Sequence, residues 1–293
     1  MLQMVRHTII IGAIAMLVIS GCEQMNIKGF FVPNGDSVQK RFEQSMQMTG
    51  SQAVQGVETQ DAYTVYVCTD PHISDSSRNL SKFNDEFRND PESTFGIVLG
   101  DCIDKKDKFH DYLSATAYNP DRHAYNPNLY HLLGNHDTYY NGWEQFRELI
   151  GPSVYWFEVK FQSGRDLYIA LDTASGTLGG KQKDWLRSFL DSERSKYRHC
   201  FILSHTHLIY SDNTQGISGN MPMEETFALI DLFDRHKVTA VLQGHDHHRD
   251  DLFYDEVRYT VIGSIEDNAK APEYLKITVK EEGISYIWVT PLA

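Results

Sequence analysis

Short segments of β-branched, aromatic and aliphatic residues recur along the chain and alternate with amphipathic segments. Residues 63–68 (YTVYVC) and 95–99 (FGIVL) have the composition of buried strands, and Phe83 and Phe87 between them have helical spacing. Strands that alternate with helices are typical of βαβ units and a parallel sheet. Further strands are predicted at residues 130–133, 154–161, 167–171, 201–203, 238–242, 257–262, 274–279 and 284–289, and further helices at 182–190 and 224–236.

The later strands have a different arrangement from the early ones. A turn at Ser163-Gly164 predicts a hairpin, and the last three strands follow one another without a long helix and are expected to be antiparallel. This end of the chain therefore indicates a second sheet that contains antiparallel pairs. We predict an α/β fold in which two mixed β-sheets pack face to face and are flanked by helices, an α/β/β/α sandwich.

The chain starts with a segment that has the features of an export signal. Residues 8–20 form an apolar run behind Arg6, and this run is too short to cross a bilayer comfortably. It ends in Ile19-Ser20-Gly21-Cys22, which resembles a bacterial lipobox. The resemblance implies that residues 1–21 are a signal peptide and that Cys22 is lipidated. We therefore expect an exported protein, lipid-anchored to the bacterial cell envelope on its periplasmic or surface face.

Polar and turn-forming residues follow the anchor. Residues 22–61 are predicted to be a tether, and residues 62–293 the folded domain. Within the tether, Asp36 or Ser37 is suited to cap a short helix with apolar residues at helical spacing. The pattern leaves open whether this helix docks on the domain.

Charge and cysteine content narrow the class of protein. The 293 residues carry a formal net charge of −13, which disfavours binding to long polyanions, so nucleic acid is not expected to be a partner. No feature of the sequence indicates a protein partner. Beyond Cys22, the three cysteines Cys68, Cys102 and Cys200 have no CxxC spacing, and each lies in or beside an apolar run. They are predicted to be buried thiols without disulfides.

Five predicted strands end in clusters of Asp, Asn or His. Ligands of open α/β sheets collect beyond the carboxyl ends of strands, so these side chains are expected to converge. Their carboxylate, amide and imidazole groups suit divalent Mn, Fe, Zn or Ni. The clusters are Asp70-Pro71-His72, Gly100-Asp101-Cys102-Ile103-Asp104, Gly134-Asn135-His136-Asp137, Ser204-His205-Thr206-His207 and Gly244-His245-Asp246-His247-His248.

Taken together and in this order, the clusters resemble the signature of the calcineurin-like metallophosphoesterases: DxH, GDxxD, GNH[DE], a lone histidine and GHxH. The resemblance covers about residues 63–290. It implies two divalent metal ions, the first held by Asp70, His72 and His247 and the second by Asn135, His205 and His245. Asp101 would bridge the two ions.

The family chemistry gives these residues their roles. Two cations about 3.5–4 Å apart clamp a phosphoryl group, and water shared between them becomes a nucleophile near neutral pH. A bridging carboxylate offsets the repulsion between the cations. The resemblance implies hydrolysis of a small phosphate ester by this route, and we expect phosphodiesters to be slightly favoured over monoesters.

Other positions have roles that the sequence leaves open. His136 matches the family's histidine that protonates the leaving oxygen, and Asp104 is expected to pair with it and raise its pKa, or to cap the following helix. His207 is a candidate for substrate contact or for support of a ligand, with a plain surface role as the alternative. Tyr139 and Tyr140 are candidates for stacking on the substrate.

Several alternatives remain at the level of sequence. The substrate could instead be a nucleotide, a pyrophosphate or a phospholipid headgroup, and a metal-binding surface lipoprotein with little turnover is the non-enzyme alternative. Asp104 stands where purple acid phosphatases have Tyr, and Lys105-Lys106 where protein serine/threonine phosphatases have Arg-Gly, so neither subfamily is favoured. The absence of HExxH disfavours a zinc protease.

Overall fold

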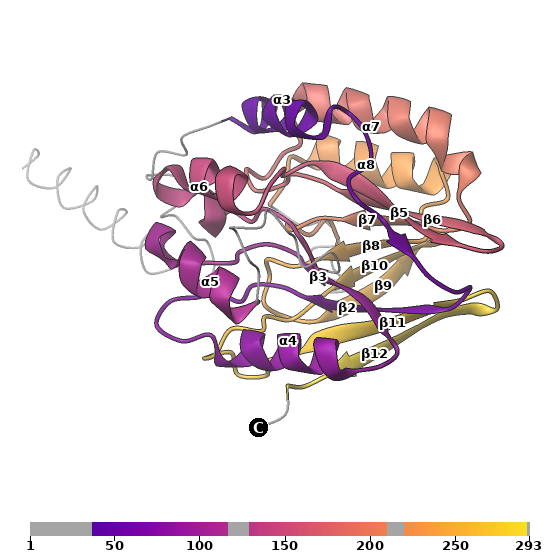
Figure 1. Ribbon diagram of the computed structural model, residues 1–293. Helices are drawn as coiled ribbons and strands as arrows, with labels where there is room; N and C mark the ends of the chain where they lie inside the picture. Colours follow the sequence, from indigo (N-terminus) through magenta and orange to yellow (C-terminus); the bar gives the residue numbers. More distant parts are fainter. Residues whose placement is uncertain (1–36, 117–128, 210–219, 292–293) are drawn as a thin grey trace, which may run out of the picture.

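The computed structural model describes residues 37–116, 129–209 and 220–291. Within these residues, the chain forms two β-sheets with helices on their outer faces (Figure 1). The predicted signal peptide and Cys22 lie outside the described residues.

The larger sheet has seven strands in the described residues, in the order β1-β5-β6-β7-β8-β10-β9. Its neighbours β6, β7, β8 and β10 run parallel to one another, whereas β5 and β9 pair antiparallel with β6 and β10. The strands are β1 (Val57–Glu58), β5 (Tyr155–Phe161), β6 (Gly164–Ala170), β7 (Cys200–Leu203), β8 (Ala240–Gln243), β9 (Asp250–Tyr254) and β10 (Val257–Val261).

The smaller sheet has five strands in the same part of the chain, in the order β12-β11-β2-β3-β4. Here β2, β3 and β4 are parallel, and β11 pairs antiparallel with both β2 and β12. The strands are β2 (Tyr63–Cys68), β3 (Ser93–Val98), β4 (Leu129–His131), β11 (Tyr274–Lys280) and β12 (Gly283–Val289).

Helices cover the outer face of each sheet, so the molecule has four layers (Figure 1). The α-helices are α3 (Val38–Thr49), α4 (Arg78–Asn89), α5 (Phe109–Ala115), α6 (Gly142–Leu149), α7 (Gly179–Glu193) and α8 (Met223–Arg235), and the 3-10 helices are η1 (Lys106–Lys108), η3 (His136–Asn141) and η4 (Arg194–Lys196). The predicted sandwich of two mixed sheets with flanking helices is confirmed.

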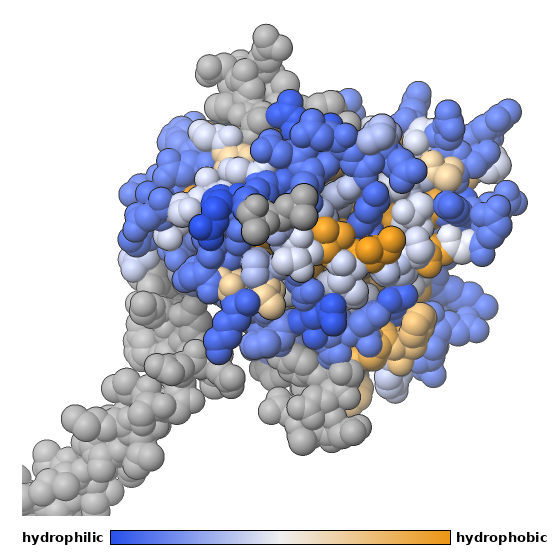
Figure 2. Space-filling view, turned by 90° about the horizontal axis from the view of Figure 1, so that it is seen from below, coloured by the Kyte–Doolittle hydropathy of each residue, from blue (hydrophilic) through white to orange (hydrophobic). Residues whose placement is uncertain are grey.

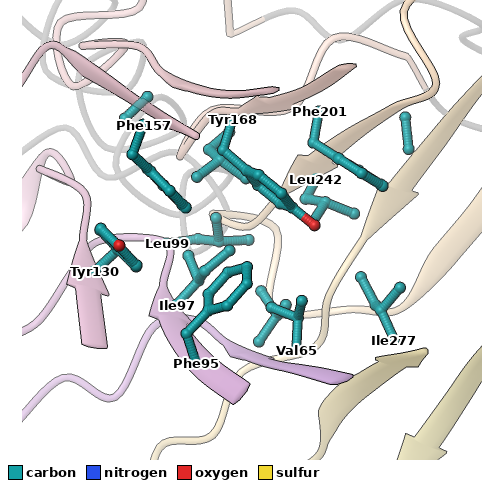
Figure 3. Packing of buried hydrophobic residues seen from close by; sticks show 14 of the residues in the cluster. Val65, Phe95, Ile97, Leu99, Tyr130, Phe157, Tyr168, Phe201, Leu242 and Ile277 are labelled. Atoms are coloured by element: carbon teal, nitrogen blue, oxygen red, sulfur yellow. The ribbon is translucent and has the colours of Figure 1, made fainter. Parts of the chain in front are cut away.

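The two sheets pack face to face over a core of aromatic and aliphatic side chains. In Figure 3, Phe157, Tyr168 and Phe201 of the larger sheet point toward Val65 and Phe95 of the smaller one. Tyr130 on β4 stacks on Phe157 with 3.7 Å between ring centroids and 2° between ring planes. This contact lies between the third parallel strand of one sheet and a hairpin strand of the other, so it ties the two sheets together.

Two further cores lie beneath the helices. One joins the smaller sheet to α4, α5 and α6, and the other joins the larger sheet to α7 and α8. The face seen in Figure 2 is largely hydrophilic, with hydrophobic residues in small separate groups. Cys68, Cys102 and Cys200 are buried free thiols, as predicted.

The end of the chain is arranged differently from the prediction. The last predicted strands were expected to be antiparallel and to build the second sheet, but β10 runs parallel to β8 in the larger sheet. Strands β11 and β12 pair antiparallel with each other, as expected, and extend the smaller sheet beside β2. Both sheets are therefore mixed, because each contains parallel as well as antiparallel pairs of strands.

Helix α3 lies within the segment that the sequence assigned to the tether. The hydroxyl of Ser37 caps it by accepting a hydrogen bond from the Lys40 N–H at 3.3 Å. The helix buries Val38 and Phe42, and Figure 1 shows it lying beside α7. Residues 57–58 then add β1 to the larger sheet. The packed part of the chain thus begins near residue 38.

Among the described residues, none of the helices combines the length and the apolar composition that a membrane crossing requires.

The buried histidine of β4 predicts a pH dependence of stability. Burial lowers the pKa of His131 to about 3, whereas a histidine in the unfolded chain titrates near 6.5. Above pH 6.5, His131 is neutral in both the folded and the unfolded state, so it does not change the free energy of unfolding. As the pH falls from 6.5 toward 3, this residue lowers the free energy of unfolding by about 1.4 kcal/mol per pH unit.

Urea unfolding at pH 7.5 and pH 5.5 tests this prediction. The variant His131→Asn keeps an acceptor for the Tyr112 hydroxyl, which lies 2.6 Å from His131 Nδ1. The variant is expected to be less stable than the wild type at pH 7.5 but to lose less stability on acidification. An equal loss in the two proteins would contradict the role given to His131.

Candidate metal centre

Backbone hydrogen bonds continue beyond the ends of β2 and β3 and join the first two predicted clusters. The N–H of Asp70 donates to the carbonyl of Gly100 at 3.1 Å, and the N–H of His72 donates to the carbonyl of Asp101 at 3.0 Å. Ile73 and Ile103 then form an isolated parallel bridge. The two loops run side by side, and this places the side chains of Asp70, His72 and Asp101 at one edge.

Glycines allow the other loops to approach this pair. An added Cβ at Gly134 would lie 2.1 Å from the backbone nitrogen of Asp101, and one at Gly244 would lie 2.0 Å from the hydroxyl of Thr69. Any side chain at these positions would push the GNHD and GHDHH loops away from the DPH and GDCID loops.

Five of the seven predicted metal ligands have left-handed backbone conformations, which are rare outside glycine. Each costs about 1 kcal/mol or more, and such conformations gather at functional sites. The φ angles are 51° at Asp70, 43° at His72, 50° at Asp101, 74° at His245 and 62° at His247. The surrounding hydrogen bonds must hold these residues in place, and this marks the edge as the functional site of the fold.

Three predicted ligands of the first metal lie together. The Nε2 atoms of His72 and His247 are 3.1 Å apart, and they lie 3.6 Å and 3.3 Å from Oδ1 of Asp70. One ligand atom from each residue lies within 4.8 Å of the other two. The backbone N–H of His245 and the hydroxyl of Thr69 hold the other oxygen of Asp70, at 2.9 Å and 2.6 Å.

The predicted ligands of the second metal form an adjoining group. Nε2 of His205 lies 3.1 Å from Oδ1 of Asn135 and 3.3 Å from Nδ1 of His245. Asp101, His205 and His245 likewise offer three ligand atoms within 4.8 Å of one another. The carbonyl of Leu99, 2.9 Å from Nδ1 of His205, orients the ring.

Asp101 lies between the two groups. Its Oδ2 atom is 3.6 Å from Nε2 of His72 and 3.3 Å from Nε2 of His205. Its Oδ1 atom accepts a hydrogen bond from the backbone N–H of His136 at 2.8 Å. The structure thus brings all seven predicted ligands together and places the predicted bridging carboxylate in the middle.

The carboxylates make this edge attractive to positive charge. Burial lowers the pKa of His205, but the neighbouring Asp101 outweighs burial and raises that pKa to about 9. Burial raises the pKa of Asp101, yet the charges on His205 and His136 hold it well below its usual range. Burial, aided by the charge on His205, lowers the pKa of His245 to about 4, so this imidazole is neutral and able to coordinate.

The donor set fits divalent cations. Oδ1 of Asp70 is buried and accepts no hydrogen bond within the described residues, although two imidazole nitrogens lie within 3.6 Å of it. A buried oxygen in this state is costly unless it coordinates a cation. Imidazole, carboxylate and amide donors together suit Mn, Fe, Zn or Ni.

A family profile described as "Calcineurin-like phosphoesterase" matches residues 63–249. The chain belongs to the calcineurin-like phosphoesterase family. This membership supports a metal-dependent hydrolase of phosphate esters that takes small substrates. No curated protein sequence matches the chain.

Solved structures of other proteins share the fold. A purple acid phosphatase from yellow lupin has a TM-score of 0.59 at 13% identity, covering 80% of this chain and 52% of its own. A dimetal phosphatase from Danio rerio has a TM-score of 0.51 at 14% identity, and the match covers 78% of this chain and 99% of the phosphatase. GAP50, the anchor in the inner membrane complex of Plasmodium, has a TM-score of 0.58 at 12% identity, covering 79% and 85%.

Asp104 contacts two histidines of this phosphoesterase. Its Oδ1 atom lies 3.0 Å from Nδ1 of His72 and 3.4 Å from Nδ1 of His136. The sequence indicated only the second contact. The rings of His72 and His136 meet edge to face, with 4.5 Å between their centroids. Asp104 therefore orients a predicted metal ligand as well as the predicted acid.

The three residues predicted to contact substrate lie in different environments. The hydroxyl of Tyr139 accepts a hydrogen bond from Nδ2 of Asn135 at 3.0 Å, which turns the Asn135 oxygen toward His205. His207 is fully buried, with its ring 6.0 Å from that of His245. These contacts indicate that Tyr139 and His207 support the predicted metal ligands Asn135 and His245. Tyr140 is 61% exposed.

Sequence reasoning missed several supporting groups. The buried carboxylate of Asp137 accepts hydrogen bonds from the N–H groups of Gly134 at 2.8 Å and Ile103 at 3.2 Å, joining two loops. The hydroxyl of Ser264 donates to the carbonyl of Asp70 at 2.8 Å. Asp137 is the last residue of the GNHD motif, so the sequence could have indicated its role. Ser264 lies in a loop that contains no motif.

The position of His136 predicts that its role in turnover can be separated from metal binding. Its side chain is 18% exposed, and the ligand atoms of His72, Asp101 and His136 lie within 4.8 Å of one another. His136→Ala is expected to lower turnover by about 10²–10⁴-fold, the usual contribution of a general acid. Metal content, measured by elemental analysis, is expected to be unchanged. A parallel loss of metal would instead make His136 a ligand.

Proposed function

We propose that this chain hydrolyses small phosphate esters at a centre of two divalent metal ions, with phosphodiesters slightly favoured over monoesters. The observation that carries the proposal is the position of Asp101, whose Oδ2 lies within 3.6 Å of a histidine from each group. One carboxylate between two sets of donors suits a bridging ligand. When bound, the two cations polarise the phosphoryl group and make water acidic enough to attack near neutral pH.

The chain itself supplies the proton for the leaving group in this proposal. His136 sits at the start of η3, beside both groups of donors and partly open to solvent. Asp104 holds Nδ1 of His136 and so directs the other ring nitrogen away from itself. Burial raises the pKa of Asp104, but the hydrogen bonds to His136 and His72 outweigh burial and hold that pKa well below its usual range, so the carboxylate is ionised.

The preference for diesters is supported by the charge around the centre. In the described part of the chain, no hydrogen bond or ion pair links a Lys or Arg side chain to the seven predicted ligands. A phosphate monoester carries close to two negative charges at neutral pH, whereas a diester carries one. Within the described residues, ligands that are not paired with a cationic side chain suit the substrate of lower charge.

Activity assays test the proposed function. The purified protein is supplied with Mn²⁺, Fe²⁺, Zn²⁺ or Ni²⁺ and offered a model phosphodiester, a monoester and a nucleotide. Hydrolysis is expected with at least one metal, to be lost with a chelator, and to fall by at least 10³-fold in Asp101→Ala, since both metals lose a ligand. Metal binding without hydrolysis of any substrate would favour the non-enzyme alternative.

We also propose that the protein is exported and held at the cell envelope by lipid on Cys22. The support is the apolar run of residues 8–20 and the lipobox-like Ile19-Ser20-Gly21-Cys22. Several acyl chains on one cysteine anchor a protein stably.

Substitution of the anchor residue tests this location. Cys22→Ser is expected to move the protein from the membrane fraction to the soluble fraction of a bacterial host, with phosphoesterase activity retained. Incorporation of labelled fatty acid is expected in the wild type alone. Equal membrane association of the two proteins would overturn the proposed anchor.

A further inference from the structure

Helix α3 reaches the metal centre through a chain of buried polar contacts that begins at Arg41. The Arg41 side chain is fully buried, and its Nε and Nη2 atoms donate to the two carboxylate oxygens of Asp172 at 2.7 Å and 2.8 Å. Nη2 also donates to the hydroxyl of Ser175 at 2.9 Å. This paired geometry fixes the orientation of the carboxylate as well as its position.

Asp172 in turn fixes the loop that follows β6. Its side chain also accepts hydrogen bonds from the hydroxyl of Ser153 at 2.8 Å and the N–H of Ala174 at 3.3 Å. Its backbone N–H donates to Oε1 of Gln182 at 2.9 Å, and its carbonyl accepts from Nε2 of the same residue at 3.0 Å. Thr173 is therefore held on both sides.

Thr173 connects this loop to the loop that contains His205. Its hydroxyl accepts hydrogen bonds from the N–H groups of His205 at 3.1 Å and Thr206 at 3.0 Å. Its carbonyl accepts from the Thr206 hydroxyl at 2.9 Å. Strand β7 ends at Leu203, so these N–H groups lie beyond its ladder. Since Thr173 is 1% exposed, water has little access to replace its hydroxyl.

We propose that Arg41, Asp172 and Thr173 are positioning residues for His205, so that helix α3 is part of the support of the metal centre. The inference rests on the proposed two-metal function and adds residues that none of the metal-ligand motifs contain. The carbonyl of Leu99 orients the His205 ring, and Thr173 sets the backbone from which that ring projects. Loss of groups that orient metal ligands typically weakens metal binding 10–100-fold.

Titration of metal-free protein with Mn²⁺ by calorimetry tests this inference without any assay of turnover. Thr173→Val has the same shape but lacks the hydroxyl, and is expected to weaken one of the two Mn²⁺ sites by about 10-fold. Asn135→Ala marks that site, and His247→Ala marks the other. Thr173→Ser, which restores the hydroxyl, is expected to recover wild-type affinity.

The helix is tested separately with a matched pair of variants. Arg41→Lys keeps the charge but loses the two-atom contact, and is expected to weaken the same site as Thr173→Val. Glu43→Gln removes an exposed ion pair between α3 and Lys181 of α7, and is expected to leave both sites unchanged. Circular dichroism checks that each variant is folded. If Arg41→Lys does not fold, the comparison of Thr173→Val with Thr173→Ser tests the positioning role by itself.

The outcomes distinguish this inference from the proposed function. Two Mn²⁺ sites in the wild type with unchanged affinities in Thr173→Val overturn the positioning role alone. A lower melting temperature in Thr173→Val with full Mn²⁺ affinity would show a merely structural role and would also overturn it. Failure of the wild type to bind two ions overturns the proposed function instead.

Discussion

The side chains packed between the two sheets determine where the metal centre forms. Tyr130 stacked on Phe157, with Phe95 and Tyr168 beside them, holds β4 of one sheet against the hairpin of the other. The parallel strands β2, β3 and β4 then end at the same edge of the sandwich as β7 and β8. Loops that belong to different sheets can share a single site only because this core fixes the two sheets relative to each other.

The centre also depends on backbone conformations that the loops alone would not favour. Five predicted ligands have positive φ angles, and each is held by contacts with a neighbouring loop. The hydrogen bond from the His72 N–H to the Asp101 carbonyl and that from the His245 N–H to the Asp70 carboxylate are examples. The site is thus stabilised by the fold around it.

Much of this arrangement could be predicted from the sequence, because the decisive signals were local. Residues 63–68 were predicted as a strand and form β2, and the polar clusters of Asp70, Asp101 and His205 follow strands as expected. The sequence did not indicate contacts between distant residues that belong to no motif. Arg41 lies in a short polar helix, and its burial depends on Asp172, which is 131 residues away. No periodicity within either segment reveals that pair.

The sequence also did not predict the strand order and register of the sheets. The segment 250–254 is rich in acidic residues and exposed positions, so it lacks the pattern of a strand, yet it pairs with β10 as β9. Strand β10 lies next to β8, and its Val257 and Tyr259 belong to the same buried cluster as residues of α8. Such choices are made by tertiary contacts rather than by propensity.

The docking of helix α3 has a consequence for how far the enzyme can reach. The helix is packed onto the domain from Val38 onward, and the sequence places 14 residues between Cys22 and Ser37. Such a stretch spans at most about 50 Å when fully extended. With the proposed lipid on Cys22, the domain would stay within about this distance of the bilayer surface.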